Sequence, residues 1–215
     1  MLYRLARFLF WIYFLIYHRI IIRGMKELKS FLASLPPGSP VILAANHESY
    51  LDPPAIGMAF PGPLRFVAWD GLFKSSLFAA LIRALGAVPV SHENKNSAAG
   101  LLRTVIGFIE DGYSVLIFPE GERTPDGELR PLEGGVALMA SKTGAPVVPV
   151  WIDGTWEAYP VHYRFPRPRR VTLTFGTPIL LSALPSDAPE KDRRRMLLES
   201  IRSALETMRD SNETR

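Results

Sequence analysis

The sequence contains no cysteine, and this absence removes several kinds of site at once. A chain without cysteine cannot form disulfides, bind a metal through thiolates or use a cysteine nucleophile. Only four histidines occur in 215 residues, which leaves little material for a metal cluster made of imidazoles. The serine elbow G-x-S-x-G is absent too, which weighs against the common serine hydrolases. We therefore expect neither a bound metal nor a covalent enzyme nucleophile.

The sequence also lacks a hydrophobic run long enough to cross a bilayer. Its apolar run at 8–17 (FLFWIYFLIY) has ten residues, and a helix of that length measures about 15 Å against a hydrocarbon core of about 30 Å. No small-residue cleavage site follows Tyr17, which disfavours a secretory signal peptide. We expect residues 1–18 to form an uncleaved helix in the bilayer interface, with Trp11 and Tyr13 at headgroup depth. The alternative is that this run covers the domain's own core.

The net charge is only +4, but the basic residues are unevenly placed. Residues 1–29 hold six Lys or Arg side chains and one Glu. A second basic cluster, Arg164, Arg167, Arg169 and Arg170, lies among prolines and aromatic residues. Patches of this kind suit anionic lipid, phosphorylated ligands or nucleic acid, although arginines on a solvated loop give the same pattern.

Short β-rich runs alternate with helical runs along the rest of the chain. The predicted strands are 20–23, 41–45, 64–68, 87–90, 114–118, 147–151 and 171–175, and the predicted helices are 26–34, 53–60, 71–85, 97–111, 133–143 and 188–209. Strands separated by single helices indicate an α/β fold. Because 47% of the residues are hydrophobic, the chain can build a sizeable core. We predict a single layered domain over 19–215, in which helices flank a mixed, largely parallel sheet.

A first polar loop, N-H-E-S-Y-L-D, follows the apolar strand predicted at 41–45. Its His47 can accept a proton near neutral pH. Asp52, five residues further on, would fix the tautomer of that imidazole and stabilise its charged form. Asp52 also precedes Pro53, which suits an N-cap followed by the first turn of a helix. A loop histidine next to a capping aspartate is therefore the alternative interpretation.

A second polar loop, F-P-E-G-E-R-T, follows the strand predicted at 114–118. Its Gly121 allows the backbone to approach a ligand, and Arg123 offers a planar fork for phosphate. Taken alone, the loop is equally well a turn with a surface salt bridge. Ligands of α/β folds gather at the carboxyl ends of strands, so we expect both polar loops at one site.

Together with G-A-V-P-V and V-V-P-V, these two blocks occur in the order and spacing found in glycerolipid acyltransferases, which the chain resembles over about 20–180. The resemblance implies transfer of a fatty acyl group from acyl-CoA or acyl carrier protein to the free hydroxyl of 1-acylglycerol 3-phosphate, giving phosphatidic acid. It implies no cofactor beyond the acyl-CoA or carrier-protein co-substrate. The expected partners are a lysolipid acceptor and a membrane lipid surface, with no nucleic acid. The expected location is the cytoplasmic face of the cell membrane, as a peripheral or monotopic protein.

The resemblance also implies residue roles. His47 is the general base and Asp52 its orienting partner, while Glu120, Gly121 and Arg123 help to hold the acceptor. Acyl transfer from a thioester to an alcohol needs such a base and a donor for the oxyanion, so direct transfer in a ternary complex is the expected mechanism.

Two departures from the family pattern bear on the acceptor. The second block commonly ends in Arg, where this chain has His92, and the third commonly reads E-G-T-R, where Glu122 replaces Thr. We expect His92 at the acceptor, although both changes remove or oppose positive charge near a phosphate. The same transfer to another lysolipid, such as a lyso-aminolipid, is therefore an alternative. Two others are an acyl-thioester hydrolase in which His47 activates water, and a non-catalytic lipid-binding module.

Overall fold

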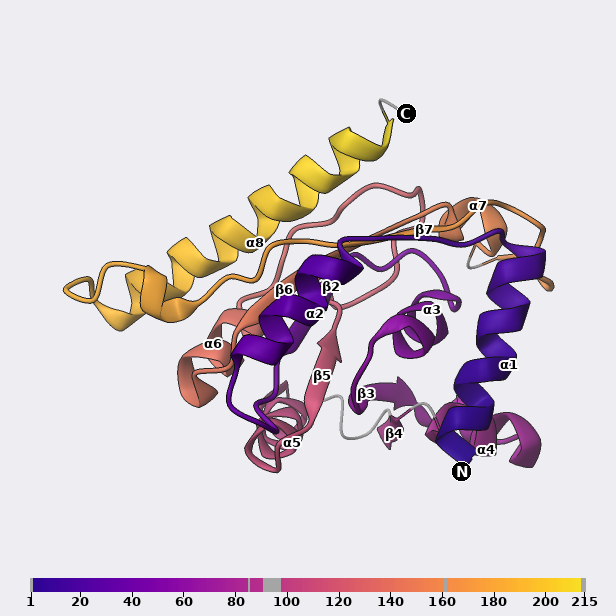
Figure 1. The fold of residues 1–215 in the computed structure, drawn as a ribbon, viewed down its shortest axis with the longest axis horizontal. Helices are drawn as coiled ribbons and strands as arrows, with labels where there is room; N and C mark the ends of the chain where they lie inside the picture. Colours follow the sequence, from indigo (N-terminus) through magenta and orange to yellow (C-terminus); the bar gives the residue numbers. More distant parts are fainter. Residues whose placement is uncertain (1, 85, 91–97, 161, 214–215) are drawn as a thin grey trace.

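The fold is a seven-stranded sheet between two layers of helices (Figure 1), seen in a computed structural model that describes residues 2–84, 86–90, 98–160 and 162–213. The strand order is β1-β7-β6-β2-β5-β3-β4. The strands are β1 (Ile21–Arg23), β2 (Ile42–Ala45), β3 (Leu64–Trp69), β4 (Ala87–Val90), β5 (Ser114–Ile117), β6 (Val147–Asp153) and β7 (Thr172–Phe175). Each overlaps one of the seven predicted strands.

All strand pairs are parallel except β6 with β7, which are antiparallel. The parallel strands at the centre are apolar because helices cover both faces of the sheet. In β2 every residue is buried, and its side chains alternate between two separate cores. Leu43 and Ala45 belong to one core, and Ile42 and Ala44 to the other. The predicted α/β fold with a mixed, largely parallel sheet is confirmed.

The helices divide between the two faces of the sheet. The core that contains Leu43 also includes buried residues of α1 (Leu2–Tyr17), α2 (Met25–Ser34), α3 (Asp52–Ala59) and α4 (Ser76–Ala84). The core that contains Ile42 includes buried residues of α5 (Ala98–Glu110), α6 (Gly135–Thr143) and α8 (Glu190–Glu213). Helix α1 therefore lies on the face opposite α5, α6 and α8.

Three helical details differ from the sequence expectation. The helix predicted at 71–85 is divided into a 3-10 turn, η1 (Asp70–Phe73), and α4, with serines at the start of α4, where their side chains favour helix ends over interiors. The single turns α7 (Thr155–Ala158) and η3 (Leu181–Ala183) were not predicted, because such short elements show no periodicity. Helix α8 also extends four residues beyond its predicted end at 209.

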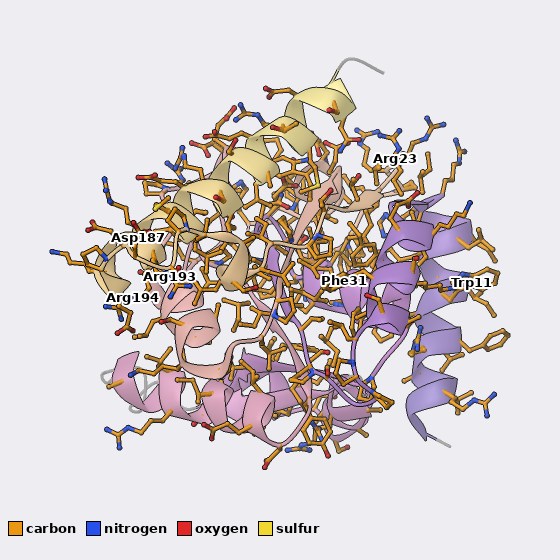
Figure 2. All side chains as sticks on the ribbon, turned by 60° about the vertical axis from the view of Figure 1, so that its left-hand side comes forward. Trp11, Arg23, Phe31, Asp187, Arg193 and Arg194 are labelled. Carbon is orange, nitrogen blue, oxygen red and sulfur yellow. The ribbon has the colours of Figure 1, made fainter. Side chains whose placement is uncertain are left out.

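Helix α1 has one packed face and one open face. Ala6 and Phe14 are buried, and Phe14 packs in a cluster with Leu51, Ala55 and Met58. Seven large apolar side chains of the same helix are exposed: Leu5, Phe8, Leu9, Trp11, Leu15, Ile16 and Tyr17. Figure 2 shows Trp11 on α1 at the outer edge of the molecule. The alternative interpretation, in which this helix covers the domain's own core, therefore holds for only one of its faces. Within the described residues, no helix is long and apolar enough to span a bilayer.

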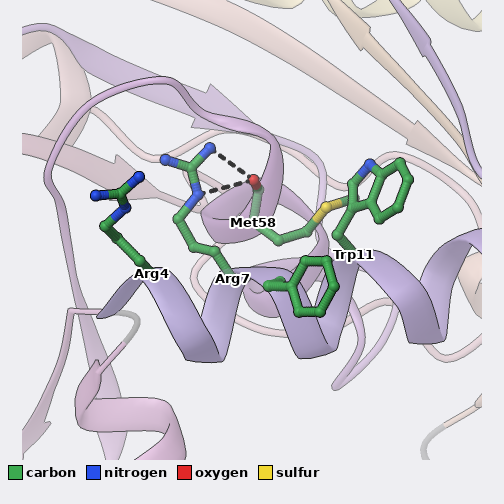
Figure 3. A pocket seen from close by; sticks show the side chains of 5 residues that line it. Arg4, Arg7, Trp11 and Met58 are labelled. Carbon is green, nitrogen blue, oxygen red and sulfur yellow. Dashed lines mark hydrogen bonds between the residues drawn. The ribbon is translucent and has the colours of Figure 1, made fainter. Parts of the chain in front are cut away.

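A hollow of about 280 Å³ lies where α1 meets α3, lined by Arg4, Arg7, Phe8, Trp11 and Met58 (Figure 3). Two nitrogens of Arg7, Nε and Nη2, donate to the carbonyl oxygen of Met58 at 3.1 and 2.9 Å. These bonds tie the first turns of α1 to the end of α3. None of the lining residues belongs to the two predicted polar loops.

Truncation of a phenylalanine to alanine should lower stability much more on the packed face of α1 than on its open face. Phe14→Ala removes a fully buried ring and should lower the free energy of unfolding by about 3–4 kcal/mol. Phe8→Ala removes a ring that is 55% exposed and should change it by less than about 0.5 kcal/mol. Urea denaturation of the two variants measures both values, and equally small losses would show that α1 does not pack on the domain.

Candidate active site

The two predicted polar loops meet at the carboxyl edge of the sheet. The His47 loop follows β2, the loop at 118–124 follows β5, and these two strands are parallel neighbours. The backbone of His47 is bonded on both sides, since its N–H donates to Glu120 Oε1 at 2.7 Å and its carbonyl accepts the N–H of Thr124 at 2.9 Å. The expected convergence of the two loops is confirmed.

The His47 ring bonds to a buried carboxylate. His47 Nδ1 lies 2.8 Å from Oδ2 of Asp52, whose side chain is fully buried, while the His47 side chain is 17% exposed. The same oxygen accepts the backbone N–H groups of Glu48 at 2.7 Å and Ser49 at 2.8 Å. Because a carboxylate oxygen only accepts, Nδ1 carries a hydrogen, and in the neutral ring the lone pair is therefore on Nε2. This arrangement prepares Nε2 to take a proton.

The predicted N-cap role of Asp52 is wrong. Helix α3 begins at Asp52 itself, with Leu51 in the N-cap position and no side-chain cap. A cap at Asp52 would serve the N–H groups of the next residues, but Pro53 and Pro54 have none. The N–H of Ala55 already donates to the carbonyl of Leu51. The carboxylate therefore turns back to the loop that precedes it.

Phe118, at the end of β5, fixes the plane of the His47 ring. The two ring centroids are 3.8 Å apart with an angle of 17° between planes, which is a stacked pair. Stacking limits the tilt of the imidazole, and the Asp52 bond limits its rotation in that plane. This contact could not be predicted from the sequence, in which Phe118 reads as the last apolar residue of a strand.

Glu120 joins the loops through its two carboxylate oxygens. Oε1 accepts the N–H of His47, and Oε2 accepts the N–H of Arg130 at 2.7 Å. Burial raises the pKa of Glu120, and these two N–H bonds oppose that rise. Gly121 follows in the left-handed region, with φ of 78°, and an added Cβ would lie 3.2 Å from Glu133 Oε1. A side chain at this position is therefore strained.

Arg123 lies over the face of Tyr50. Its Cζ is 3.6 Å from the ring centroid, close enough for a cation–π interaction. One guanidinium nitrogen, Nη1, is buried and has no hydrogen-bond partner within the described residues. A buried charged donor of this kind is suited to an anionic ligand oxygen. Tyr50 was not singled out from the sequence. His92, expected at the acceptor, lies outside the described residues.

A second polar network lies beneath the loop. Asn46 pairs with β6 as a strand residue would, since its Oδ1 accepts the N–H of Ile152 at 2.7 Å and its Nδ2 donates to the Ile152 carbonyl at 2.8 Å. Asn46 Nδ2 also donates to Glu48 Oε1 at 2.9 Å. The other oxygen of Glu48 accepts from Thr155 Oγ1 at 3.2 Å and from the N–H of Trp156 at 3.3 Å. Burial, followed by the negative charge of Asp52, raises the pKa of Glu48 well above its ordinary value.

Comparison with known proteins gives the chain clear relatives. The sequence profile of the family described as Acyltransferase matches residues 20–153. A chloroplastic 1-acyl-sn-glycerol-3-phosphate acyltransferase of Brassica napus is 30% identical over 144 residues, which cover 67% of this chain and 40% of the relative. This chain thus spans less than half the length of that relative. A 1-acyl-sn-glycerol-3-phosphate acyltransferase of Bacillus subtilis is 25% identical over 176 residues, which cover 81% of this chain and 84% of the relative.

A solved structure shares the architecture. The crystal structure of the 1-acyl-sn-glycerophosphate (LPA) acyltransferase PlsC from Thermotoga maritima aligns with a TM-score of 0.76 at 25% sequence identity. The alignment covers 100% of this chain and 79% of that chain. The N-terminal helix, the sheet and the covering helices therefore all have counterparts in a solved structure.

Glu48 predicts a pH dependence of stability. Its pKa is raised in the folded state, so above the ordinary carboxyl range the folded chain binds more protons than the unfolded chain. The contribution of Glu48 to the free energy of unfolding should therefore fall as the pH rises from 5 to 8. Glu48→Gln cannot titrate and should lack this contribution, so the free energy of unfolding of the variant should decrease less over this range than that of the wild type. Urea denaturation across this range measures the difference.

The exposed Glu110 offers the matched control. The pH profile of Glu110→Gln should follow that of the wild type. If Glu48→Gln follows the wild type as closely, Glu48 ionises in the fold and the buried network is not neutral.

Proposed function

The chain belongs to the acyltransferase family, and we propose that it transfers a fatty acyl group from a thioester, acyl-CoA or acyl carrier protein, to the free hydroxyl of 1-acylglycerol 3-phosphate. The observation that carries the proposal is the 2.8 Å bond between His47 Nδ1 and the buried Asp52 carboxylate, on a loop that also meets Arg123. The names of the Brassica and Bacillus relatives support the acceptor. The resemblance to this family, which the four sequence blocks indicate, is confirmed.

The proposed reaction is direct transfer. Nε2 of His47 takes the proton of the acceptor hydroxyl as its oxygen attacks the thioester carbonyl carbon. The Asp52 carboxylate stabilises the imidazolium that forms. When the tetrahedral intermediate collapses, the carbon–sulfur bond breaks and the imidazolium returns its proton to the leaving thiolate. His47 is then neutral again, and no acyl-enzyme is formed.

The acceptor phosphate is assigned to Arg123. Its guanidinium combines a fixed charge, a buried donor without a partner and a ring that holds it in place. Glu120 and Gly121 contribute by shaping the loop that carries Arg123, since both Glu120 oxygens bind backbone N–H groups. This division leaves His47 for the hydroxyl and Arg123 for the phosphate of one acceptor molecule.

We further propose that α1 places the site at a membrane. Its open face carries seven large apolar side chains, and an amphipathic helix of this kind binds by burying such a face among headgroups and acyl chains. Its packed face contacts α3, which begins at Asp52. A lysolipid in the same bilayer is then presented next to the His47 loop.

The direct test is a product assay with purified protein, labelled acyl-CoA and lysophosphatidate. The wild type should form labelled phosphatidate, and His47→Ala should lower the turnover by about 10²–10⁴. Asp52→Asn should lower it too, because it removes the charge that stabilises the imidazolium. Asp111→Asn, on an exposed residue, serves as the control. Release of free fatty acid alone would indicate a hydrolase, and normal turnover in a folded His47→Ala protein would exclude His47 as the base.

Arg123→Lys separates acceptor binding from chemistry. Lysine keeps the charge but loses the planar fork and the stack on Tyr50, so the KM for lysophosphatidate should rise about tenfold while kcat changes little. Tyr50→Phe keeps an aromatic face and should keep the wild-type KM. An acceptor without phosphate, 1-acylglycerol, should show the same KM with wild type and Arg123→Lys. An equal rise for both acceptors would place the phosphate elsewhere.

A further inference from the structure

The basic cluster at 162–170 (HYRFPRPRR) is an exposed loop with four arginines and no acidic residue. We name this segment the arginine loop. Phe165 is 72% exposed, and every other residue of the loop is exposed except the half-buried Pro166. Across the described parts of the chain, no ion pair joins any of the four arginines to a carboxylate. The loop therefore presents positive charge that the chain itself does not neutralise.

The backbone of the arginine loop is held against the end of α1. Tyr17 Oη donates to the carbonyl of Pro166 at 3.0 Å, and His18 Nδ1 donates to the carbonyl of Arg169 at 3.2 Å. The N–H of Arg167 donates to the carbonyl of Ala158 at 2.7 Å. These bonds fix the position of the loop backbone, while its arginine side chains stay exposed, with Arg167 over the ring of Tyr163 at 3.9 Å. A charged loop of fixed position is a binding surface more than a linker.

The loop continues the open face of α1. Ile16, which is 74% exposed, and Tyr17 end that face, and Tyr17 bonds to the loop next to Phe165. Figure 1 shows the last turn of α1 beside α7, from which the chain runs into the loop. Exposed apolar side chains thus lie, along one edge of the molecule, together with arginines that no carboxylate of the described residues pairs.

This combination favours a membrane with anionic lipids over other acidic partners. Arginine binds phosphate groups at the headgroup level, while Phe165 and the apolar side chains of α1 need acyl chains to leave water. A nucleic acid or an acidic protein would satisfy the arginines and leave the apolar side chains exposed. Helix α1 also contacts the His47 loop, since Phe14 packs with Leu51. On the other side, Ser49 Oγ donates to the carbonyl of Tyr159 at 2.8 Å, three residues before the arginine loop begins.

We propose that the arginine loop is a second membrane contact, which binds the headgroups of anionic phospholipids while α1 inserts its apolar face. Two contacts fix the orientation of the domain on the bilayer, and the His47 loop packs on α1 and bonds to Tyr159, just before the arginine loop. The proposal extends the proposed function by naming the lipid charge that the chain selects. Binding itself does not depend on acyl transfer, so it is tested without substrates.

The test is sedimentation of the full chain with two kinds of vesicle, phosphatidylcholine alone and phosphatidylcholine with about 30% phosphatidylglycerol, whose negative surface potential attracts basic segments. The wild type should bind the anionic vesicles at least about tenfold more tightly. In the loop variant, Arg164, Arg167, Arg169 and Arg170 are changed to Gln. This variant should lose most of that preference, at about fivefold for each arginine that contacts the surface, and should bind phosphatidylcholine as the wild type does.

The matched control removes the same charge from the opposite face. In it, the exposed Arg103, Lys142, Lys191 and Arg195 of α5, α6 and α8 are changed to Gln. It should keep the wild-type preference, and so should a variant with the four loop arginines changed to Lys, because lysine retains the charge. High salt should abolish the preference of the wild type and leave its binding to phosphatidylcholine.

Three results would overturn the proposal. In the first, the loop variant keeps the anionic preference. In the second, the control variant loses as much preference as the loop variant, which would show an effect of bulk charge. In the third, the loop variant binds both vesicles normally but loses the use of acyl carrier protein relative to acyl-CoA, which would assign the loop to an acidic protein. A failed acyl-transfer assay with normal vesicle selectivity would instead contradict the proposed function alone.

Discussion

Three N–H groups converge on one buried oxygen of Asp52, and the shape of the site follows from these bonds. A carboxylate that is removed from water is tolerated only if donors replace its hydration. Here the donors come from the loop of the same chain segment, so satisfying the charge also winds that loop around the carboxylate. The histidine is one of the three donors, and its orientation is therefore set by the need to satisfy a buried charge.

The rest of the sheet edge is built to hold this loop. Glu120 and Thr124 bond the backbone of His47 from the β5 side, and Asn46 bonds the other side to β6. The loop after β2 is thus fixed on both sides, by the Glu120 carboxylate and the Thr124 backbone toward β5 and by the Asn46 amide toward β6. Phe118 then closes one face of the imidazole. These contacts give an imidazole with a fixed ring and a fixed tautomer, which we propose as the general base of acyl transfer.

Much of this arrangement could be predicted because the sheet is buried on both faces. Strands of that kind read as short apolar runs, and all seven were found near their true positions. The meeting of the two polar loops followed from parallel strands having their carboxyl ends at one edge. The family blocks then added the roles proposed for His47, Asp52 and Arg123.

The parts that escaped prediction depend on contacts between distant segments. Pro53 and Pro54 have no N–H groups that a side chain could cap. For this reason the Asp52 carboxylate bonds to the loop that precedes it and does not cap helix α3. Glu48 reads as a surface residue until Thr155 and Trp156 are seen to enclose it. Helix α1 reads as either a core or an interfacial helix, because periodicity cannot tell which face a distant helix will cover.

The site's central geometry can be measured on His47 directly, by ¹⁵N NMR of the imidazole in the wild-type chain at pH 8. We predict the tautomer with hydrogen on Nδ1 and a free lone pair on Nε2, and hydrogen on Nε2 would contradict the account.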